Sequence, residues 1–518
     1  MTNLTRRSIL AAIALSTPLA LGACGGDDQT GSTGAAKDGG ATGGTLTYVT
    51  GPEPVGLDPA NLQVTAGSGH GGRGYAVFGM LLGVDSEKGE VVPGIADSLE
   101  STTDLATWTL KLKDGVKFTD GTPFDAEAVK YNWERHTDPK LGSVQASIAG
   151  RIKSMKASDA TTLEITLKEP LAQWPSLVAG GLTFIGSPKA LKDKGKEFAG
   201  SPVGAGPFIF ESWRRNDAVE YKPNPDYYAG APKLEHLTIR SVPDEQQRAD
   251  TVTSGSDMIA RITNPQTAAD LKTNGATVHV VDVSGGTTFI MNFQKAPFDD
   301  ARVREALWLT FDHKDYNETV FGGNATTPTN YFAEGSPYFT PEVTFPEPDL
   351  AKAQRLIDEY TKDKGSVSFS IQTQQPGPAE YLQQTFQQLK GVKVKVEQLA
   401  GPTQVGNAFS GNFVASTLGI QVVTPAPQFH DEFRTGGSRN FGKYSSEVVD
   451  KALAEIEAST DLDEQRKGYA KVQEQLIKDH AEMITARVNG MDVLNEGVIV
   501  PQWFSDGIPA LDRASVGN

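Results

Sequence analysis

TWTLKLKDGVKFTDGTPFDAEAVKYNWERH, residues 107–136, holds the clearest structural pattern in this chain of 518 residues. Apolar Trp108, Leu110 and Leu112 alternate with polar residues, which predicts a strand with one buried face. Asp125 stands where an N-cap is expected, before a helix predicted from 126 to about 136. Together with a strand expected downstream, this region is predicted to form a small α+β lobe.

A second pattern lies far downstream of the first. Apolar residues alternate over 367–371 and again over 392–396, and residues 378–389 between them suit a helix. Strand, helix and strand in this order predict a βαβ unit, in which a right-handed crossover joins two parallel strands. Further helices are expected near 350–357 and 469–476. The chain is therefore predicted to be of the α/β class.

The first 44 residues differ in composition from the rest. Two arginines and then an apolar run over 9–21 predict a secretory signal peptide at 1–23, and the arginine pair leaves both the general and the twin-arginine export route open. Leu21-Gly22-Ala23-Cys24 resembles the bacterial lipobox, which implies that Cys24, the only cysteine, carries a lipid anchor. Residues 24–44 are rich in glycine and are predicted to be a flexible linker.

Composition excludes several classes of function. Without residues 1–23 the chain has 46 Lys and Arg against 64 Asp and Glu, a net charge of −18, and this acidity argues against binding to nucleic acid. A single cysteine provides no disulfide framework and no zinc–thiolate site. The seven histidines are scattered, and no serine-hydrolase motif occurs. We therefore expect no metal, no cofactor, no catalytic residues and no enzymatic activity.

Residues Gly69 to Gly74 satisfy the pattern G-x-G-x-x-G. A dinucleotide site needs a strand that runs directly into the first glycine, but three prolines separate this segment from the strand predicted at 45–50. The segment is predicted instead to be a loop that lines a ligand cleft.

The stretch 107–136 resembles the signature segment of family 5 of the extracellular solute-binding proteins of ABC importers, the group that binds oligopeptides, dipeptides or nickel. The resemblance implies a two-lobed periplasmic-binding-protein-like fold of type II, with an extra α+β subdomain and hinge strands between the lobes. Matching segments follow in family order at 56–60, 91–100, 202–213, 222–259 and 292–307. The implied domains are domain I at 45–88, 206–297 and 490–518, domain II at 89–205, and domain III at 298–489.

The resemblance also implies a function. The protein would be a monomer, exported and anchored to the outer face of the cytoplasmic membrane. It would capture a peptide or another small solute between its lobes and deliver it to an ABC permease with its ATPases. Two alternatives are a receptor subunit that presents a peptide signal to a membrane sensor, and a secreted hydrolase.

The ligand is harder to predict than the family. Peptide-binding members present an aspartate to the peptide ammonium group from a G-W-x-A-D segment, whereas Ile420 and Val423 occupy the aromatic and acidic positions here. This departure disfavours a peptide with a free amino terminus, unless Asp431 or Glu432 takes that role. A cation at Arg73 would favour a carboxylate or phosphate on the ligand. The expected ligand contacts are Ser68, His70, Arg73, Phe289, Asn292, Gln421 and Thr424.

Overall fold

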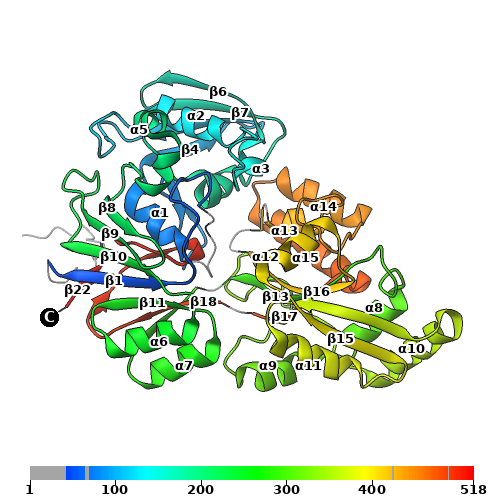
Figure 1. Cartoon of the computed structure of the whole chain (residues 1–518). Helices are drawn as coiled ribbons and strands as arrows, with labels where there is room; N and C mark the ends of the chain where they lie inside the picture. Colours follow the sequence, from blue (N-terminus) through cyan, green and yellow to red (C-terminus); the bar gives the residue numbers. More distant parts are fainter. Residues whose placement is uncertain are drawn as a thin grey trace, which may run out of the picture. The chain divides into compact units, whose positions relative to one another are not determined.

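The computed structural model of the chain describes residues 43–62, 64, 69–281, 283–422, 425–426, 428–487 and 489–517, all within a unit formed by residues 40–518. The signal peptide, Cys24 and nearly all of the linker that the sequence predicts lie outside the described residues. Three larger sheets, of seven, five and four strands, organise this unit (Figure 1).

The stretch 107–136 forms one strand of the four-stranded antiparallel sheet and the helix that follows it. We call this sheet and the helices around it, residues 89–205, the inserted subdomain. Asp125 caps the predicted helix by accepting a hydrogen bond from the Ala128 amide over 2.8 Å, and Trp133 packs edge-on against Trp174 in the core. The sheet order is β4 (Ala96–Ser101), β5 (Thr107–Leu112), β7 (Thr162–Leu167) and β6 (Ile152–Asp159), with α2 (Ala126–Arg135), α3 (Ala146–Ala149), α4 (Trp174–Leu177), α5 (Pro188–Lys194) and the short helical turns η1 (Val178–Leu182) and η2 (Gly195–Gly200).

The seven-stranded sheet draws its strands from three distant parts of the chain. The first strand lies at its centre and is parallel to both of its neighbours. Figure 1 shows α1 on one face of this sheet and α6 and α7 on the other. The order is β12 (Thr277–Val281), β18 (Gly490–Leu494), β11 (Met258–Ile262), β1 (Thr45–Thr50), β10 (His236–Ser241), β9 (Ala218–Pro223) and β8 (Phe208–Arg214), with α1 (His70–Phe78), α6 (Glu245–Ser254) and α7 (Pro265–Thr273).

Three two-stranded pairs complete this part of the molecule. Two of them, β2 with β3 and β20 with β21, are hairpins, and both contribute residues near the second lobe. They are β2 (Leu82–Val84) with β3 (Val91–Pro93), β19 (Val498–Ile499) with β22 (Ser515–Val516), and β20 (Trp503–Phe504) with β21 (Ile508–Pro509), beside the helical turn η3 (Ser505–Gly507).

The five-stranded sheet contains the predicted βαβ unit. Its two strands are parallel and in register from Val367↔Val392 to Thr373↔Gln398, as expected, and the helix between them begins at Pro376, two residues before the prediction, because proline suits the first turn of a helix. The order is β15 (Val392–Gln398), β14 (Val367–Thr373), β16 (Ala415–Val422), β13 (Ser284–Met291) and β17 (Glu482–Ala486).

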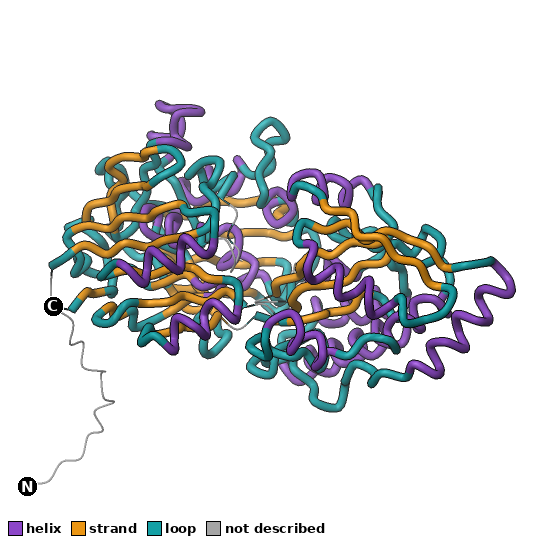
Figure 2. The backbone as a smooth tube through the Cα atoms, turned by 60° about the horizontal axis from the view of Figure 1, so that its bottom comes forward, coloured by secondary structure: helices purple, strands orange, loops and turns teal. Residues whose placement is uncertain are grey.

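Helices cover the five-stranded sheet on both sides (Figure 1), and Figure 2 shows the strands of the two larger sheets as separate groups with helices outside them. None of the helices in the described part of the chain is long and apolar enough to cross a membrane. These helices are α8 (Ala301–Trp308), α9 (His313–Phe321), α10 (Leu350–Lys364), α11 (Pro376–Phe386), α12 (Gly401–Ser410), α13 (Gln428–Phe433), α14 (Glu447–Glu457) and α15 (Leu462–Asp479).

The chain passes between the two larger sheets twice, from β12 to β13 and from β17 to β18. We call residues 43–281 and 489–517 the first lobe and residues 283–487 the second lobe. Because β13 pairs with β16 and β17, residues 284–297 belong to the second lobe. The strand pairing thus places the change of lobe before β13, whereas the prediction ends this part of domain I at 297.

Candidate functional site

A cavity of about 200 Å³ lies where the two lobes meet, next to the strands that cross between them. The hairpin between β2 and β3 and the turn after β20 line it from the first lobe, and a loop after residue 332 and the end of β16 line it from the second. Its lining residues are Asp85, Ser86, Glu87, Gly89, Val281, Ser284, Ala333, Gly335, Ser336, Pro337, Val422 and Ser505.

The charges on this lining are negative. Asp85 and Glu87 are its charged residues, and no basic side chain lines the cavity among the described residues. One carboxylate oxygen of Asp85 accepts the backbone amides of Glu87 and Lys88, each over 3.0 Å, and the other accepts the side-chain amide of Gln502 over 3.3 Å. Asp85 is thus fixed in place, while the Glu87 side chain is exposed. Such a lining favours a ligand with a cationic group.

Hydroxyl groups supply the remaining polarity of the cavity. Ser284 accepts the Ala333 amide over 3.0 Å, which joins the start of β13 to the second-lobe loop. The Ser86 hydroxyl is buried and has no hydrogen-bond partner among the described residues. A buried hydroxyl left without a partner is costly, and a polar ligand atom in the cavity would remove that cost.

The crossing segments beside the cavity are tied to each other and to its wall. The Val283 amide donates to the Asn489 side chain over 3.4 Å, from one crossing to the other. Arg487 is buried and donates to four carbonyls, of Gly285, Asn330, Tyr331 and Phe332, over 2.7–3.3 Å. These bonds hold the loop that lines the second-lobe side of the cavity.

The segment from Gly69 to Gly74 is not the loop that the sequence predicts. The helix α1 begins at His70, and its glycines pack too closely for any side chain. A Cβ atom at Gly71 would lie 2.4 Å from Ile508, and one at Gly74 would lie 2.5 Å from Phe184. The glycines therefore serve close packing of a buried helix.

Arg73 does not face the cavity, in contrast to the prediction. Its side chain is fully buried in the first lobe, where it donates to the hydroxyls of Thr50 and Ser241 over 2.8 Å each. Burial lowers the pKa of its guanidinium. His70 lies at the start of the same helix, with Nε2 3.0 Å from the Pro52 carbonyl, and it is not among the residues that line the cavity.

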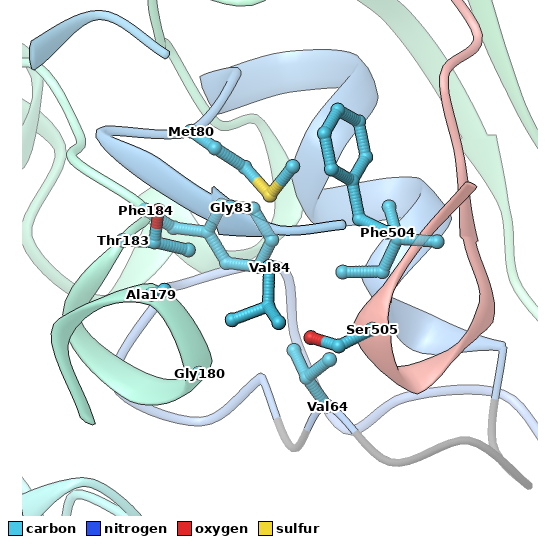
Figure 3. Close-up of a pocket in the computed structure, with 11 residues that line it drawn as sticks. Val64, Met80, Gly83, Val84, Ala179, Gly180, Thr183, Phe184, Phe504 and Ser505 are labelled. Atoms are coloured by element: carbon cyan, nitrogen blue, oxygen red, sulfur yellow. The ribbon is translucent and has the colours of Figure 1, made fainter. Parts of the chain in front are cut away.

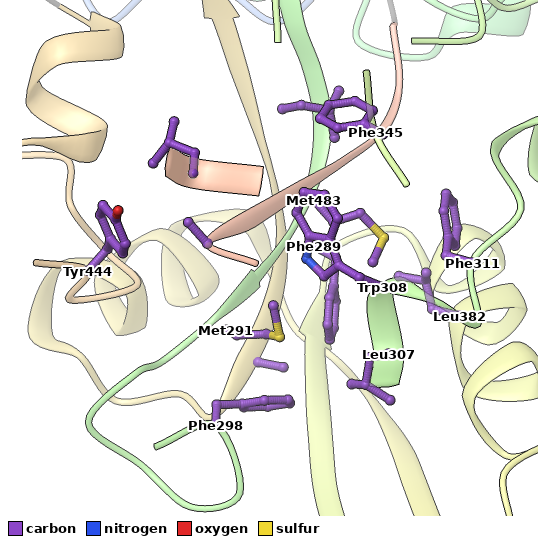
Figure 4. Close-up of a cluster of buried hydrophobic side chains, with 14 of the residues drawn as sticks. Phe289, Met291, Phe298, Leu307, Trp308, Phe311, Phe345, Leu382, Tyr444 and Met483 are labelled. Atoms are coloured by element: carbon purple, nitrogen blue, oxygen red, sulfur yellow. The ribbon is translucent and has the colours of Figure 1, made fainter. Parts of the chain in front are cut away.

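Phe289 and Asn292 also lie away from the cavity. Figure 4 shows Phe289 inside the core of the second lobe, where its ring packs 5.2 Å from that of Phe386. Asn292 is buried and donates to the Phe413 carbonyl over 3.2 Å. Phe289 lies on β13 and Asn292 just after it, near the crossing as predicted, but their side chains meet the protein interior and not the cavity.

Three of the predicted contacts cannot be placed. Ser68 and Thr424 lie outside the described residues, and of Gln421 only the backbone is described, paired with Gly285 between β16 and β13. Gln421 directly precedes Val422, which lines the cavity. These three ligand contacts stay predictions.

Glu432, which the sequence offered as a substitute for the missing acid, is buried in the second lobe. It lies beside Glu482 and 3.4 Å from the Arg439 guanidinium. Burial, and then repulsion from Glu482, raise its pKa well above the usual range. The cavity lining does not include Glu432 or Asp431.

Two further pockets lie in the first lobe, and one of them adjoins the cavity. One, drawn in Figure 3, has room for about one water molecule, about 10 Å³, and is lined mainly by apolar side chains such as Met80 and Phe504. It shares Ser505 with the cavity between the lobes and shares Met80 and Phe504 with a larger pocket of about 280 Å³. In the described residues, no group of three or more His, Cys, Asp or Glu comes together to hold a metal ion.

Sequence reasoning missed Asp85, Ser86 and Glu87. The segment VDSEKGEVV (84–92) has the polar and glycine residues of a surface hairpin, so the hairpin itself could have been predicted from the sequence. Nothing in the local pattern indicates that the hairpin faces another lobe.

Comparison with known proteins agrees with this architecture. The family model of the bacterial extracellular solute-binding proteins, family 5 (middle region), matches residues 90–440. The glutathione-binding protein GsiB of Escherichia coli O1:K1 / APEC is 33% identical to this chain over 323 residues, which are 62% of this chain and 63% of that protein. The matched part thus spans less than two thirds of the length of these curated relatives.

Solved structures show the same fold. The oligopeptide-binding protein AppA from Bacillus subtilis, in complex with a nonapeptide, superimposes with a TM-score of 0.79 at 19% identity and covers 92% of this chain and 100% of its own. The periplasmic binding protein DppA from Helicobacter pylori, in complex with the peptide STSA, gives a TM-score of 0.79 at 22% identity, over 92% and 99%. The predicted two-lobed α/β fold is confirmed, and the chain belongs to the bacterial extracellular solute-binding proteins of family 5.

Proposed function

We propose that this protein captures a small peptide, or a peptide-like solute with a free amino group, in the cavity between its lobes and delivers it to the permease of an ABC importer. The observation that carries the proposal is the position of the cavity, which both lobes line beside the crossing strands. A ligand there contacts both lobes at once, so its binding favours the closed arrangement of the lobes.

The class of ligand follows from the cavity and from the relatives. GsiB is a glutathione-binding protein by name, and the solved structures of AppA and DppA hold peptides. The carboxylates of Asp85 and Glu87 supply a counter-charge for an ammonium group from the first lobe. These two carboxylates would take over the role of the aspartate that the resemblance predicts at the position of Val423. Ser68, Gln421 and Thr424 are proposed as further contacts.

Calorimetric titration of the full-length protein with glutathione and trialanine, each free and N-acetylated, tests this proposal. We expect binding of at least one free-amino ligand and a weaker response from its acetylated form. The double variant Asp85→Asn/Glu87→Gln should bind the free ligand roughly five- to tenfold more weakly, because a partly exposed ion pair contributes about 1 kcal/mol.

Glu90→Gln is the matched control, since Glu90 is an exposed acid of the same hairpin outside the cavity lining. Its affinity should equal that of the unmodified protein. Equal affinity for free and acetylated ligands would contradict the role of the two acids. Consumption of a ligand with no stable binding would instead favour the alternative of a secreted hydrolase.

We further propose that residues 1–23 direct export and that a lipid on Cys24 anchors the protein to the outer face of the membrane. The support is the lipobox-like sequence and membership of an extracellular family. A protein carrying Cys24→Ala should lose the mass of the lipid and leave the membrane fraction. Retention of the variant in that fraction would contradict the anchor.

A further inference from the structure

The two lobes also meet away from the cavity, between the inserted subdomain and the C-terminal end of α14. The Ala172 amide donates to the Glu457 carbonyl over 2.9 Å, and the Gln173 side chain donates to the Ile456 carbonyl over 3.1 Å. Figure 1 shows the inserted subdomain, at α3, facing α14 across the space between the lobes. The last carbonyls of a helix have no partner within it. Here the other lobe donates to the carbonyls of Ile456 and Glu457, and the Ile456 carbonyl also accepts the Ser459 amide of its own lobe over 3.2 Å.

A charged contact accompanies these two hydrogen bonds. Arg151 of the inserted subdomain lies 3.9 Å from the Glu457 carboxylate. Within the second lobe the same carboxylate accepts from Arg434 over 2.7 Å and lies 3.1 Å from Nδ1 of His430. Burial tends to raise the pKa of Glu457, but the hydrogen bonds from His430 and Arg434 outweigh burial and hold the pKa at about 2. The carboxylate therefore remains charged toward Arg151.

A second hydrogen bond of His430, to Tyr469, also fixes the orientation of Glu457. His430 is fully buried, and its Nε2 lies 2.8 Å from the Tyr469 hydroxyl. A carboxylate only accepts hydrogen bonds, so Nδ1 of a neutral His430 carries the proton and Tyr469 donates to Nε2. Glu457 is thus held in one position, and closing the lobes at this edge requires no rearrangement of the second lobe.

We propose that Arg151, Ala172 and Gln173 with the Ile456–Glu457 end of α14 form a latch that closes the lobes without any ligand. These contacts join different lobes, so they exist only in the closed arrangement and bias the equilibrium toward it. None of these residues lines the cavity. The latch goes beyond the proposed function: it adjusts the apparent affinity for any ligand, because that affinity scales with the fraction of protein already closed.

Hydrogen exchange at the Ala172 amide measures the latch directly. This amide donates across the lobes, so in the ligand-free, full-length protein it should exchange slowly. In the double variant Arg151→Ala/Gln173→Ala we expect roughly five- to tenfold faster exchange, since two of the three contacts are lost. Small-angle scattering of the same variant should show a larger radius of gyration than that of the unmodified protein.

Lys153→Ala is the matched control, because Lys153 is an exposed cation two residues from Arg151. It should leave exchange at Ala172 unchanged. Arg151→Ala alone removes one partly buried contact, and it is the variant to use if the double variant does not fold. Exchange of Ala172 at the unprotected rate in the unmodified protein, or equal rates in protein and variant, would overturn the latch. Neither result depends on a ligand, so the latch and the proposed function can fail separately.

Discussion

The buried ion pair between Arg261 on β11 and Asp492 on β18 predicts how strongly the first lobe depends on one charged contact. Arg261 Nε donates to one carboxylate oxygen over 2.9 Å, and its Nη2 donates to the other over 2.6 Å. Both side chains are fully buried. The Tyr48 hydroxyl on β1 accepts from Arg261 and donates to Asp492. Three strands from distant parts of the chain therefore share one polar network.

Asp492→Asn removes the negative charge and leaves the Arg261 guanidinium buried without a counter-charge. Removing one partner of a buried pair costs about 3–5 kcal/mol, whereas replacing both partners by apolar residues of similar size is often nearly neutral. We therefore expect Asp492→Asn to lose about 3–5 kcal/mol of unfolding free energy, and Arg261→Met/Asp492→Leu to lose less than either single change. Tyr48→Phe should lose about 1 kcal/mol, the usual net value of a hydrogen bond.

Hydrogen exchange of the amides in β11 and β18 gives the opening free energy of the first lobe alone. Urea unfolding of the same full-length variants gives the unfolding free energy of the whole protein, which should fall by a similar amount. The β14 and β15 amides of the second lobe are the internal control and should not change. The reasoning is refuted if Asp492→Asn costs less than about 1 kcal/mol, or if the double variant loses as much as the two single changes added together.

Three further predictions concern stability. Burial lowers the pKa of His313 to about 4. The fold holds its neutral form, so the unfolding free energy should be highest above pH 6.5 and should fall as the pH drops toward 4. In a pH series of urea unfolding, His313→Gln should make this fall smaller. Burial raises the pKa of Glu482 above its usual range. The cost of ionising it in the fold therefore grows as the pH rises, so Glu482→Gln should stabilise the protein at pH 8.5 and have little effect at pH 4.5 in the same urea series. Gly286 has φ of +142°, and a Cβ there would lie 2.0 Å from the Ala486 carbonyl; Gly286→Ala should cost at least about 2 kcal/mol in thermal unfolding, whereas Gly377→Ala, in open space within a helix, should stabilise slightly.

The elements that could be predicted are those whose own residues determine them. The helix after Asp125 and the parallel pair of β14 and β15 follow from capping and from alternation, which act within a few residues. The helix α1 could not be predicted in this way, because glycine has low helix propensity. Packing against Ile508 and Phe184, which lie more than a hundred residues away, outweighs that propensity.

The site could not be predicted for the same physical reason. Its walls come from a hairpin near 85, a crossing near 284, a loop near 335 and a turn near 505, and only the fold brings these segments together. The resemblance to family 5 predicted a cleft between lobes, but not which side chains line it. The prediction that Phe289 and Asn292 lie near the crossing did not anticipate that β13 is buried on both of its faces, so that side chains at and just after this strand meet the core on either side.

The placement of Arg73 changes which ligand the protein should prefer. A cation in the cleft would have favoured a carboxylate or phosphate, but the guanidinium is enclosed by the first lobe and bonded to Thr50 and Ser241. The charges that do line the cavity are those of Asp85 and Glu87. Electrostatic selection at this site therefore favours a cation, and it comes from the first lobe. An ammonium group bound to Asp85 and Glu87 would contact the first lobe, while the rest of the ligand reaches the second-lobe loop after residue 332.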